Sequence, residues 1–439
     1  MERADVVVVG AGAAGLFAAV WAGRELEPRG RVIALDGARK LGAKILVAGG
    51  GRCNVTHHAV DETAYAGSSR NAVRKVLGRF GVERTVEFFR ERGVELKQED
   101  TGKLFPVSDD AHSVLGALLA AAGEAGVSLA HPWRVGEVRL AADCGFEIVE
   151  QAAPGVEPRR VLARRVILAT GGMALPKTGS DGAGYAIARS LGHSVTERVF
   201  PALVPLLLPQ AHWLCGLSGL TTVASVSVRS ASGKMVASFT NSLLCTHFGL
   251  SGPAILDVSR YYLAELGAAG AGGASDGASR PALLINWLPA HTFDSLDAEL
   301  ARGGKQTCAR TLANLGVPER LARGLCEAAG VDGAASLHSL SRGARVKLAT
   351  AATAFEAPVV GDRGFTYAEV TAGGVPLGEV RLETMESRVC PGLHLCGEIL
   401  DVDGRIGGFN FQWAWATGYV AGLGAARGLG LKPSGGPTD

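Results

Sequence analysis

The chain lacks three features: cysteines in CxxC spacing, a long hydrophobic run, and a strong net charge. Its eight cysteines are scattered along 439 residues, which argues against structural zinc, another metal site or a CxxC redox centre and indicates reduced thiols. No apolar run approaches about 18 residues without a charge or a strong breaker, so we expect neither a membrane span nor a signal peptide. We therefore expect a cytoplasmic protein without a membrane partner. A net charge of +2 predicts no surface committed to polyanions.

The N-terminal stretch ADVVVVGAGAAG predicts a dinucleotide-binding β-α-β unit. An apolar strand ends at Gly10, which makes the tight turn, while Gly12 admits the phosphates and Gly15 lets helix pack on strand. The second strand ends at Asp36, about 20 residues after the last glycine, where an acid accepts a ribose hydroxyl. Because 61 glycines produce chance matches, the surrounding strands and helix carry this prediction more than the glycines do.

Two further glycine-rich stretches predict contacts with the same ligand. Residues 49–54, GGGRCN, place Arg and Asn directly after three glycines, which favours a ligand-binding loop over a flexible linker. Near the C-terminus, Gly397 and Glu398 follow a short strand, and Gly407–Gly408 open a helix. A helix N-terminus there could stabilise negative charge on a reduced flavin ring.

The middle of the chain has a different pattern. Prolines and alternating stretches after about residue 196 predict antiparallel strands, and helical segments follow residue 293. A low-complexity stretch, residues 267–280, predicts a surface loop, and residues 70–92 read as one helix with exposed cations. We therefore expect residues 1–195 and 353–439 to form one α/β domain. Residues 196–352 are expected to form an inserted β-rich and helical domain over the substrate.

Several long motifs resemble the bacterial aminoacetone-oxidase-like, BaiN-like family of FAD-binding oxidoreductases, within the two-dinucleotide-binding-domain flavoproteins. They are GAGAAG (10–15), KLGAKILVAGGGRCNVT (40–56), FPVSDDAHSV (105–114), ATGGMALPKTGSDGAGYAIARSLGH (169–193), THFGLSGPAILDVS (246–259), EVTAGGV (369–375) and GEILDVDGRIGGFNFQWAWATGYVAG (397–422). The resemblance covers nearly the whole chain. It implies a discontinuous Rossmann-like FAD-binding domain and an inserted β-barrel-like plus helical domain.

The resemblance also implies non-covalent FAD and assigns its contacts. Asp36 stands where such flavoproteins usually carry Glu, which predicts longer or water-mediated ribose contacts. The expected cofactor-binding residues are Gly10, Ala11, Gly12, Ala13, Ala14, Gly15, Asp36, Gly37, Arg39, Lys40, Lys44, Gly49, Gly50, Gly51, Arg52, Cys53, Asn54, Val135, Thr170, Gly171, Gly172, Gly397, Glu398, Asp401, Gly407, Gly408, Phe409, Asn410 and Gln412. Val135 is expected beside adenine, and residues 408–412 are expected at the pyrimidine edge of the flavin.

The acid–base residue is left open by the sequence. His247 is the first catalytic candidate because histidine titrates near neutrality, with a buried structural role as the alternative. Arg52 would bind an anionic substrate group or the flavin, or else form an ion pair. Cys53 would be redox-active or, more in keeping with its isolation in the sequence, a packing residue.

The sequence favours an oxidoreductase that transfers a hydride between flavin N5 and a small molecule. No second GxGxxG framed by strand and helix occurs, so NAD(P)H would be only a transient reductant, and O2 is the other possible redox partner. Two alternatives stay open: a flavoprotein that modifies tRNA or another nucleic acid, motivated by the cations of residues 70–79, and a non-catalytic redox sensor. The substrate and the oligomeric state are not predicted.

Overall fold

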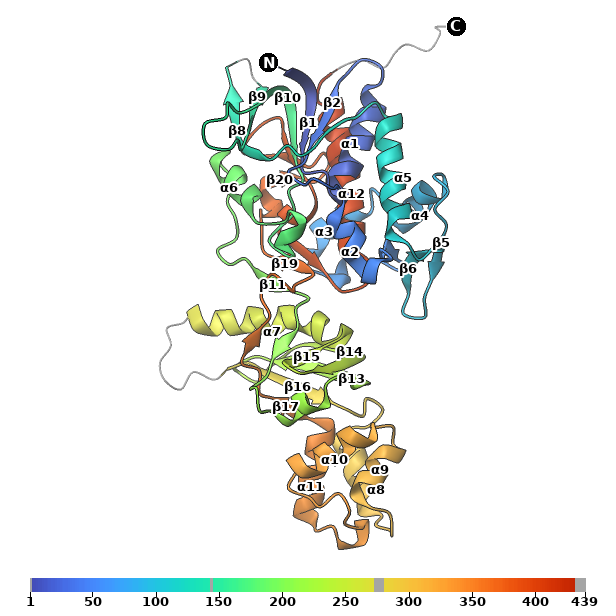
Figure 1. Ribbon diagram of the computed structural model, residues 1–439. Coiled ribbons are helices and arrows are strands. Elements are labelled where there is room, and N and C mark those ends of the chain that lie inside the picture. Colours follow the sequence, from blue (N-terminus) through green and yellow to red (C-terminus); the bar gives the residue numbers. More distant parts are fainter. Residues whose placement is uncertain (1, 143–144, 272–279, 431–439) are drawn as a thin grey trace. The chain divides into compact units, whose positions relative to one another are not determined.

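The computed structural model describes residues 2–142, 145–271 and 280–430, which form two compact units. The first unit comprises residues 1–201 and 369–439, and the second comprises residues 202–368 (Figure 1). The insert extends beyond residue 352, because β17 (Phe355–Ala357) and β18 (Gly361–Asp362) pair with strands of the second unit. Residues 353–368 therefore belong to the second unit, although the sequence placed them in the first.

A parallel sheet forms the core of the first unit, in the order β22-β10-β1-β2-β7. These strands are β1 (Glu2–Val9), β2 (Val32–Leu35), β7 (Ser128–Ala130), β10 (Arg160–Leu168) and β22 (Leu393–Leu395). In the central strand, residues 6–9 are at most 3% exposed, as expected for a parallel strand covered on both faces. The Rossmann-like α/β arrangement expected from the sequence is confirmed.

Helices α1 (Ala13–Leu26) and α12 (Phe409–Arg427) lie side by side against this sheet (Figure 1). Further helices of the first unit are α2 (Ala43–Gly51), α5 (Ala111–Glu124) and α6 (Ala183–Ser190). The single helix expected over residues 70–92 is wrong. Two helices are present, α3 (Arg70–Leu77) and α4 (Val82–Arg90), because Gly78 ends the first and Gly81 caps the second.

Short antiparallel strands complete the first unit. The hairpin β8 (Val135–Ala141) and β9 (Gly145–Glu150) extends β10, and β20 (Val380–Arg381) and β21 (Glu386–Ser387) extend β22. The small sheets are β3 (Thr56–His57) with β6 (Lys103–Pro106) and β5 (Leu96–Gln98), β4 (Tyr65–Gly67) with β23 (Val402–Gly404), and β11 (Phe200–Ala202) with β19 (Val370–Ala372). The pairing of β4 with β23 joins the two sequence segments of this unit.

The sheet of the second unit is antiparallel and curved, in the order β17-β16-β13-β14-β15-β12-β18. Its other strands are β12 (Leu206–Leu207), β13 (Thr221–Arg229), β14 (Met235–Thr246), β15 (Gly249–Ser251) and β16 (Ala282–Asn286). Only residues 358–360 connect the two edge strands. Such a connection reaches about 14 Å, whereas the edges of a flat seven-stranded sheet lie about 29 Å apart. The sheet must curl, so the barrel-like expectation is confirmed.

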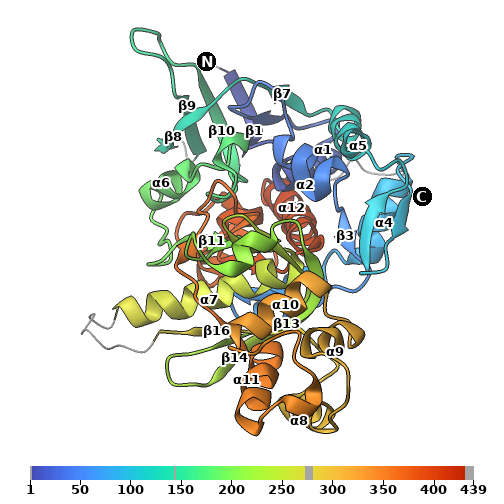
Figure 2. The same ribbon diagram turned by 60° about the horizontal axis from the view of Figure 1, so that its bottom comes forward.

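Five helices accompany this sheet within the described part of the second unit. Helix α7 (Pro253–Ala271) packs on β13 and β14 (Figure 2), and the others are α8 (Phe293–Ala301), α9 (Cys308–Asn314), α10 (Glu319–Ala328) and α11 (Arg342–Thr353). The loop expected over residues 267–280 is wrong in its first part, because α7 continues to Ala271. Residues 272–279 lie outside the described residues.

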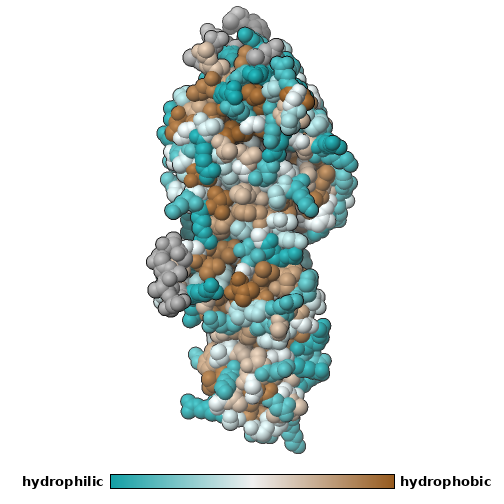
Figure 3. Space-filling model, turned by 60° about the vertical axis from the view of Figure 1, so that its left-hand side comes forward, coloured by the Kyte–Doolittle hydropathy of each residue, from teal (hydrophilic) through white to brown (hydrophobic). Residues whose placement is uncertain are grey.

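The surface carries no single dominant hydrophobic feature on the face shown in Figure 3, where brown residues lie in small groups among hydrophilic ones. The exposed large hydrophobic side chains come from separate elements of the chain, and include Val47, Leu140, Val223 and Val360. Scattered exposed hydrophobic residues are ordinary on protein surfaces. Within the described ranges, no helix is both long and apolar enough to cross a membrane.

We expect acid to destabilise the protein partly through His394 of β22. This side chain is 1% exposed, its Nδ1 contacts Thr384 O at 2.9 Å, and burial lowers its pKa to about 4. Between pH 6.5 and 4 the unfolded chain binds the proton that the folded chain excludes, so stability falls as pH falls, by on the order of 3 kcal/mol.

Urea unfolding at several pH values tests this expectation. His394→Gln keeps an N–H donor but cannot titrate, so its stability should depend less on pH over this interval. His338→Gln, at an exposed side chain of the second unit, is the matched control and should unfold with the wild-type pH dependence. Equal pH dependence in wild type and His394→Gln would contradict the expectation.

Candidate functional site

Three glycines build the N-terminus of α1, each for a different steric reason. Gly10 has a φ of +97°, and a Cβ there would lie 2.5 Å from Ala169 O. A Cβ on Gly15 would lie 1.8 Å from Gly10 O, so only glycine lets the helix approach the strand this closely. Gly12 is the N-cap of α1, and a Cβ there would meet no described atom within 4 Å. Open space beside the N–H groups of Ala13 and its neighbours suits a phosphate.

The carboxylate of Asp36 is fixed at the end of β2 by two backbone N–H groups. Its Oδ2 accepts from Ala11 N at 2.7 Å, and its Oδ1 accepts from Ala38 N at 2.7 Å. A carboxylate oxygen accepts more than one hydrogen bond. Both oxygens can therefore still accept a hydrogen bond from a sugar hydroxyl. The hydrogen bond from Ala11 N fixes the carboxylate next to the glycine turn.

The segment leading into Val135 lies beside this acid. Trp133 N donates to Asp36 O at 2.6 Å. A Cβ on Gly37 would lie 3.1 Å from Arg134 Cβ. Val135 itself is 8% exposed and opens β8. The two residues before the predicted adenine neighbour thus lie next to the predicted ribose acid and Gly37.

Helices α1 and α12 pack backbone to backbone and run parallel. A Cβ on Gly418 would lie 2.7 Å from Ala14 O, and a Cβ on Gly422 would lie 2.4 Å from Ala18 O. Since an α-helix rises 1.5 Å per residue, this register places the start of α12 about 12 Å beyond the start of α1. Both helices have a glycine N-cap without a side-chain cap among the described residues. A ligand that uses both N-termini must be extended.

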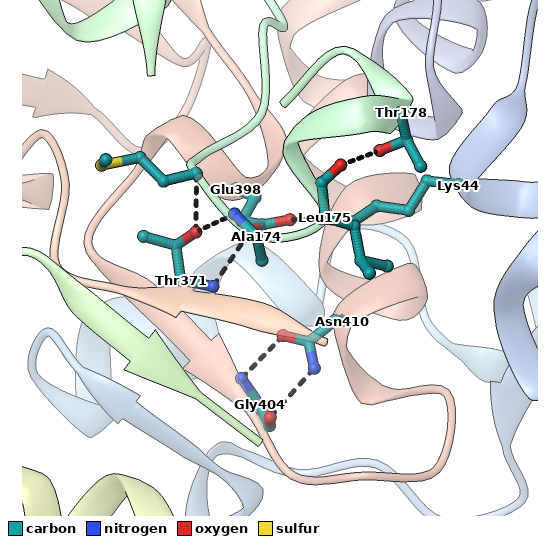
Figure 4. A network of polar contacts seen from close by, with 9 residues as sticks. Lys44, Ala174, Leu175, Thr178, Thr371, Glu398, Gly404 and Asn410 are labelled. Atoms are coloured by element: carbon teal, nitrogen blue, oxygen red, sulfur yellow. Dashed lines mark hydrogen bonds and ion pairs between the residues drawn. The ribbon is translucent and has the colours of Figure 1, made fainter. Parts of the chain in front are cut away.

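An ion pair between the two sequence segments lies in this region. Lys44 Nζ of α2 is 2.6 Å from Glu398 Oε2, and Glu398 Oε1 accepts from Thr371 N at 3.0 Å. Thr371 Oγ1 in turn accepts from Met173 N at 2.7 Å and from Ala174 N at 3.0 Å (Figure 4). Four segments far apart in sequence are therefore tied together by one polar network.

The close packing around this network requires glycine at two neighbouring positions. A Cβ on Gly172 would lie 2.4 Å from Thr371 Oγ1 and 3.0 Å from Glu398 Oε1. Gly397 has a φ of +78°, and its Cβ would lie 2.7 Å from Ala14 Cβ. Thr371 was not among the residues expected at the site, although the motif EVTAGGV contains it.

The three glycines after Ala48 close α2 in left-handed conformations. Gly49, Gly50 and Gly51 have φ values of +59°, +70° and +89°. A Cβ on Gly49 would lie 2.8 Å from the Phe105 ring, whereas one on Gly50 would meet no described atom within 4 Å. This turn therefore presents bare backbone on one side, as expected of a surface that a planar ligand approaches.

The turn leads directly to the N-terminus of α12. Asn54, oriented with its amide oxygen toward Gly408, accepts from Gly408 N at 3.1 Å and donates to Thr56 O at 2.9 Å. A Cβ on Gly408 would lie 2.5 Å from Thr56 O. The predicted stretches 49–54 and 407–408 are thus brought together, and Asn54 joins them through its side chain.

The side chain of Gln412 bonds to the protein, so the expected contact of this residue with the cofactor stays a prediction and would involve its backbone. Its Oε1 accepts from Thr56 Oγ1 at 2.7 Å and from Thr85 Oγ1 at 2.9 Å. Its Nε2 donates to Phe80 O at 2.9 Å, and the residue is 1% exposed. The side chain of Gln412 thus bonds to three other segments of the chain. From the sequence alone, such a residue cannot be told apart from one that binds a ligand.

The side chains of Asn410 and Phe409 also make their contacts within the protein. Asn410 Oδ1 accepts from Gly404 N at 2.8 Å and its Nδ2 donates to Gly404 O at 2.9 Å (Figure 4). The Phe409 ring stacks on His57 with centroids 4.8 Å apart. Both side chains fix the loop around Gly407, which leaves its backbone as the part that a ligand would meet.

The hydroxyl of Thr170 faces Gly184 of α6. Its Oγ1 is buried without a hydrogen-bond partner among the described residues, and a Cβ on Gly184 of α6 would lie 1.8 Å from it. The expected place of Thr170 and Gly171 over the adenosine half of the cofactor stays a prediction. Only the backbone of Thr170 and Gly171, which has a φ of +73°, lies at the turn beside Gly10.

Arg52 forms the ion pair that the sequence left as the alternative. Its Nη1 is 2.5 Å from Glu99 Oε1 and 3.6 Å from Asp109 Oδ1, and its guanidinium lies 4.1 Å from the Phe105 ring centroid. The hydrogen bond to Glu99 raises the pKa of Arg52. The Arg52 guanidinium is thus already paired with carboxylates of the protein. Its expected contact with a substrate or with the flavin stays a prediction.

Cys53 is a packing residue. It is fully buried, and burial raises the pKa of its thiol to about 12. A thiolate is therefore scarce at neutral pH and no reagent reaches it, which argues against the redox role. Its φ of +60° is rare for a residue with a side chain.

Four further candidates are Arg39, Lys40 and Asp401 of the first unit and His247 of the second. Arg39 and Lys40 follow β2 at the surface, and Asp401 N donates to Val375 O at 2.9 Å. His247 is exposed in the turn between β14 and β15, with its ring 5.0 Å from that of Phe248. It is therefore not a buried structural histidine, and its catalytic role stays a prediction.

The described residues fit an extended, anionic dinucleotide better than a metal. Two uncapped helix N-termini, an acid held at a strand end and bare glycine backbone converge in the first unit. FAD carries a pyrophosphate, a ribose and a flat ring, which match these features in kind. In the described part of the chain, no three His, Cys, Asp or Glu side chains are grouped to hold a metal ion.

Comparisons with known proteins agree with this geometry. The family model of the HI0933-like protein Rossmann domain matches residues 4–424. The chain belongs to this family. It is 35% identical over 424 residues to the 3-dehydro-bile acid delta(4,6)-reductase of Clostridium scindens, which covers 96% of this chain and 98% of the relative. The resemblance expected from the motifs is confirmed.

The chain is also similar to a second curated protein and to a solved structure. The chain is 32% identical over 424 residues to the ribosomal RNA dihydrouridine synthase of Escherichia coli, covering 96% of this chain and 97% of the relative. The solved 3-ketosteroid delta1-dehydrogenase of Sterolibacterium denitrificans shares the fold, with a TM-score of 0.52, 12% identity, and coverage of 97% and 100% of the two chains. The expected enzyme class, a flavin-dependent oxidoreductase, is confirmed at that level.

Two glycine variants test the α1 site. Gly12→Ala should fold with an unchanged thermal midpoint in the absence of FAD, because its methyl meets no described atom, but should lose at least tenfold in FAD affinity. Gly15→Ala should lower the midpoint of the FAD-free protein itself, because its methyl would collide with Gly10 O.

Thermal unfolding and titration with FAD, followed by flavin fluorescence, measure both effects. Gly116→Ala, on α5, also adds a methyl where no described atom lies within 4 Å and should change neither quantity. Normal FAD affinity in Gly12→Ala would show that the phosphates lie elsewhere.

Proposed function

We propose that this protein is an FAD-dependent reductase of a carbon–carbon double bond conjugated to a carbonyl group. The observation that carries the proposal is the shared chemistry of two relatives with different substrates. A 3-dehydro-bile acid delta(4,6)-reductase saturates a double bond conjugated to a ketone. A dihydrouridine synthase saturates the uracil double bond beside a ring carbonyl. Both chains match over almost their full length, so the common reaction is the best candidate for this one.

The reaction needs a hydride at the β carbon and a proton at the α carbon of the substrate. Reduced FAD, when bound, supplies the hydride from N5. NAD(P)H is the proposed source of those electrons, as a visiting reductant and not a resident cofactor. We propose that FAD is held without a covalent bond, so acid precipitation of the protein should release it into the supernatant.

The chain's own residues would bind and orient the cofactor. The N–H groups of α1 after Gly12 would hold the pyrophosphate, and Asp36 the ribose. Lys44 and Glu398 would border the linking chain between the two helix N-termini. The N-terminus of α12 after Gly408 would meet the pyrimidine edge, where its partial positive charge favours negative charge on the reduced ring.

The second candidate concerns the substrate and not the reaction. The likeness to a ribosomal RNA dihydrouridine synthase favours a uracil within RNA, whereas the bile acid relative favours a free small molecule. This differs from the expectation of no nucleic-acid partner. Reductase chemistry is common to both, so it can be tested before the substrate is known.

Anaerobic stopped-flow absorbance tests the reaction. The flavin is reduced beforehand and mixed with a 4-en-3-one steroid or a uridine-containing RNA oligonucleotide. We expect at least one of them to restore the oxidised flavin spectrum and to yield the saturated product. The saturated analogue of each substrate is the control. No reoxidation by any conjugated double bond, with rapid reoxidation by O2, would overturn the proposal.

His247 is the proposed source of the proton. His247→Ala should lower kcat at least tenfold, because an imidazole can donate the proton and a methyl group cannot. His338→Ala replaces another exposed histidine of the second unit and should leave turnover unchanged. Unchanged turnover in His247→Ala would exclude this histidine.

A further inference from the structure

Helix α3 presents a row of cations on the surface of the first unit. Its buried face consists of Val73, Val76 and Leu77. Its other face exposes Arg70, Arg74 and Lys75, and Arg79 follows on the turn to α4. No acidic residue occurs between positions 70 and 82. The charges therefore recur at steps of about one helical turn, roughly 5 Å.

These cations are only partly compensated by neighbouring acids. Arg74 Nη1 lies 3.6 Å from Glu62 Oε1, with the arginine side chain 64% exposed. The charge of Arg70 contributes to the lowered pKa of Asp61, whose largest cause is a hydrogen bond from Thr63. Within the described residues, Lys75 and Arg79 contact no carboxylate. An ordinary salt-bridged helix surface would pair most of these charges.

An arginine stacked on aromatic rings continues the row. The Arg84 guanidinium lies 4.5 Å from the Tyr419 ring centroid and 4.9 Å from that of Phe80. Its Nη1 donates to Arg79 O at 2.7 Å and its Nη2 to Tyr419 OH at 3.1 Å. The planar cation is thus held in place while its residue stays exposed, so little side-chain entropy is lost when it binds an anion.

The row begins next to the candidate site. Strand β4, directly before α3, pairs with β23 so that Gly67 is opposite Val402. Tyr65 OH donates to Phe409 O at 2.8 Å. The N-terminal end of α3 is therefore anchored to the segment that leads into the N-terminus of α12, where the flavin edge is expected.

We propose that Arg70, Arg74, Lys75, Arg79 and Arg84 form a surface that binds the phosphates of an RNA substrate. This inference rests on the proposed reductase function and assigns it a uracil-containing RNA as substrate class. A free small molecule carries too few charges to need five cations, whereas an RNA strand offers a repeated anion and bases that stack on guanidinium planes. The row would hold the strand on the face that begins at the site.

Fluorescence anisotropy of the FAD-loaded protein with a labelled, uridine-containing RNA hairpin tests the surface at several salt concentrations. The triple variant Arg74→Ala, Lys75→Ala, Arg79→Ala should bind at least tenfold more weakly. The slope of log affinity against log salt should shrink by about two units, because each lost phosphate contact removes roughly 0.7 to 0.9. FAD content and thermal midpoint of the variant show that it is folded.

A matched control removes the same charge elsewhere. Arg302→Ala, Lys305→Ala, Arg310→Ala changes three exposed cations of the second unit and should leave RNA affinity within about twofold. Equal losses in both triple variants, or no salt-dependent RNA binding by the wild type, would overturn the proposed surface. Binding of poly-glutamate as tight as that of RNA would overturn it in favour of an acidic protein partner.

The outcomes separate this inference from the proposed function. Reduction of a 4-en-3-one steroid without RNA binding would refute the surface and leave the reductase proposal standing. RNA binding with the expected salt slope, together with no reoxidation of reduced flavin by any conjugated double bond, would support the surface and refute the reductase proposal.

Discussion

The packing of α1 against α12 is the constraint on which the candidate site depends. Gly418 and Gly422 bring the two helix backbones so close that a methyl at either position would collide with a carbonyl oxygen of α1. Close parallel packing sets the register, and the register sets the offset of about 12 Å between the two N-termini. Each N-terminus is a site for negative charge. Their separation selects an extended ligand over a compact one.

The polar network around Thr371 completes this arrangement. It links Lys44, Glu398 and the turn at residues 172–174 by hydrogen bonds and one ion pair. The two side chains of the ion pair are 27% and 18% exposed. A partly exposed pair of this kind adds little to the free energy of unfolding. It holds the two sequence segments of the unit at one place beside the glycine turn.

The sequence predicted what depends on local steric rules. The glycine turn at residues 10–15, the acid at the end of β2 and helix α5 follow from strand period, glycine conformation and apolar spacing, and the structure agrees with each. The curled sheet of the second unit was also expected. Residues 70–92 were misread as one helix because cation spacing outweighed the two glycines that end and restart it.

The direction in which each side chain points could not be predicted from the sequence. Gln412, Asn410, Thr170 and Arg52 have the chemistry of ligand-binding residues, yet the structure gives their polar atoms to the protein or buries them. Their partners come from segments distant in the chain, so no local pattern identifies them. Thr371 illustrates the converse, because only folding brings its hydroxyl to the turn at residues 173–174.

The sequence by itself determined the Rossmann-like unit and the family, because glycine turns and strand ends are encoded by neighbouring residues. The tertiary structure alone decided which side chains remain available to a ligand. It also decided that two helix N-termini share one region and that α3 begins beside it. These depend on the packing of residues hundreds of positions apart, where a single close glycine contact fixes the relation of whole elements.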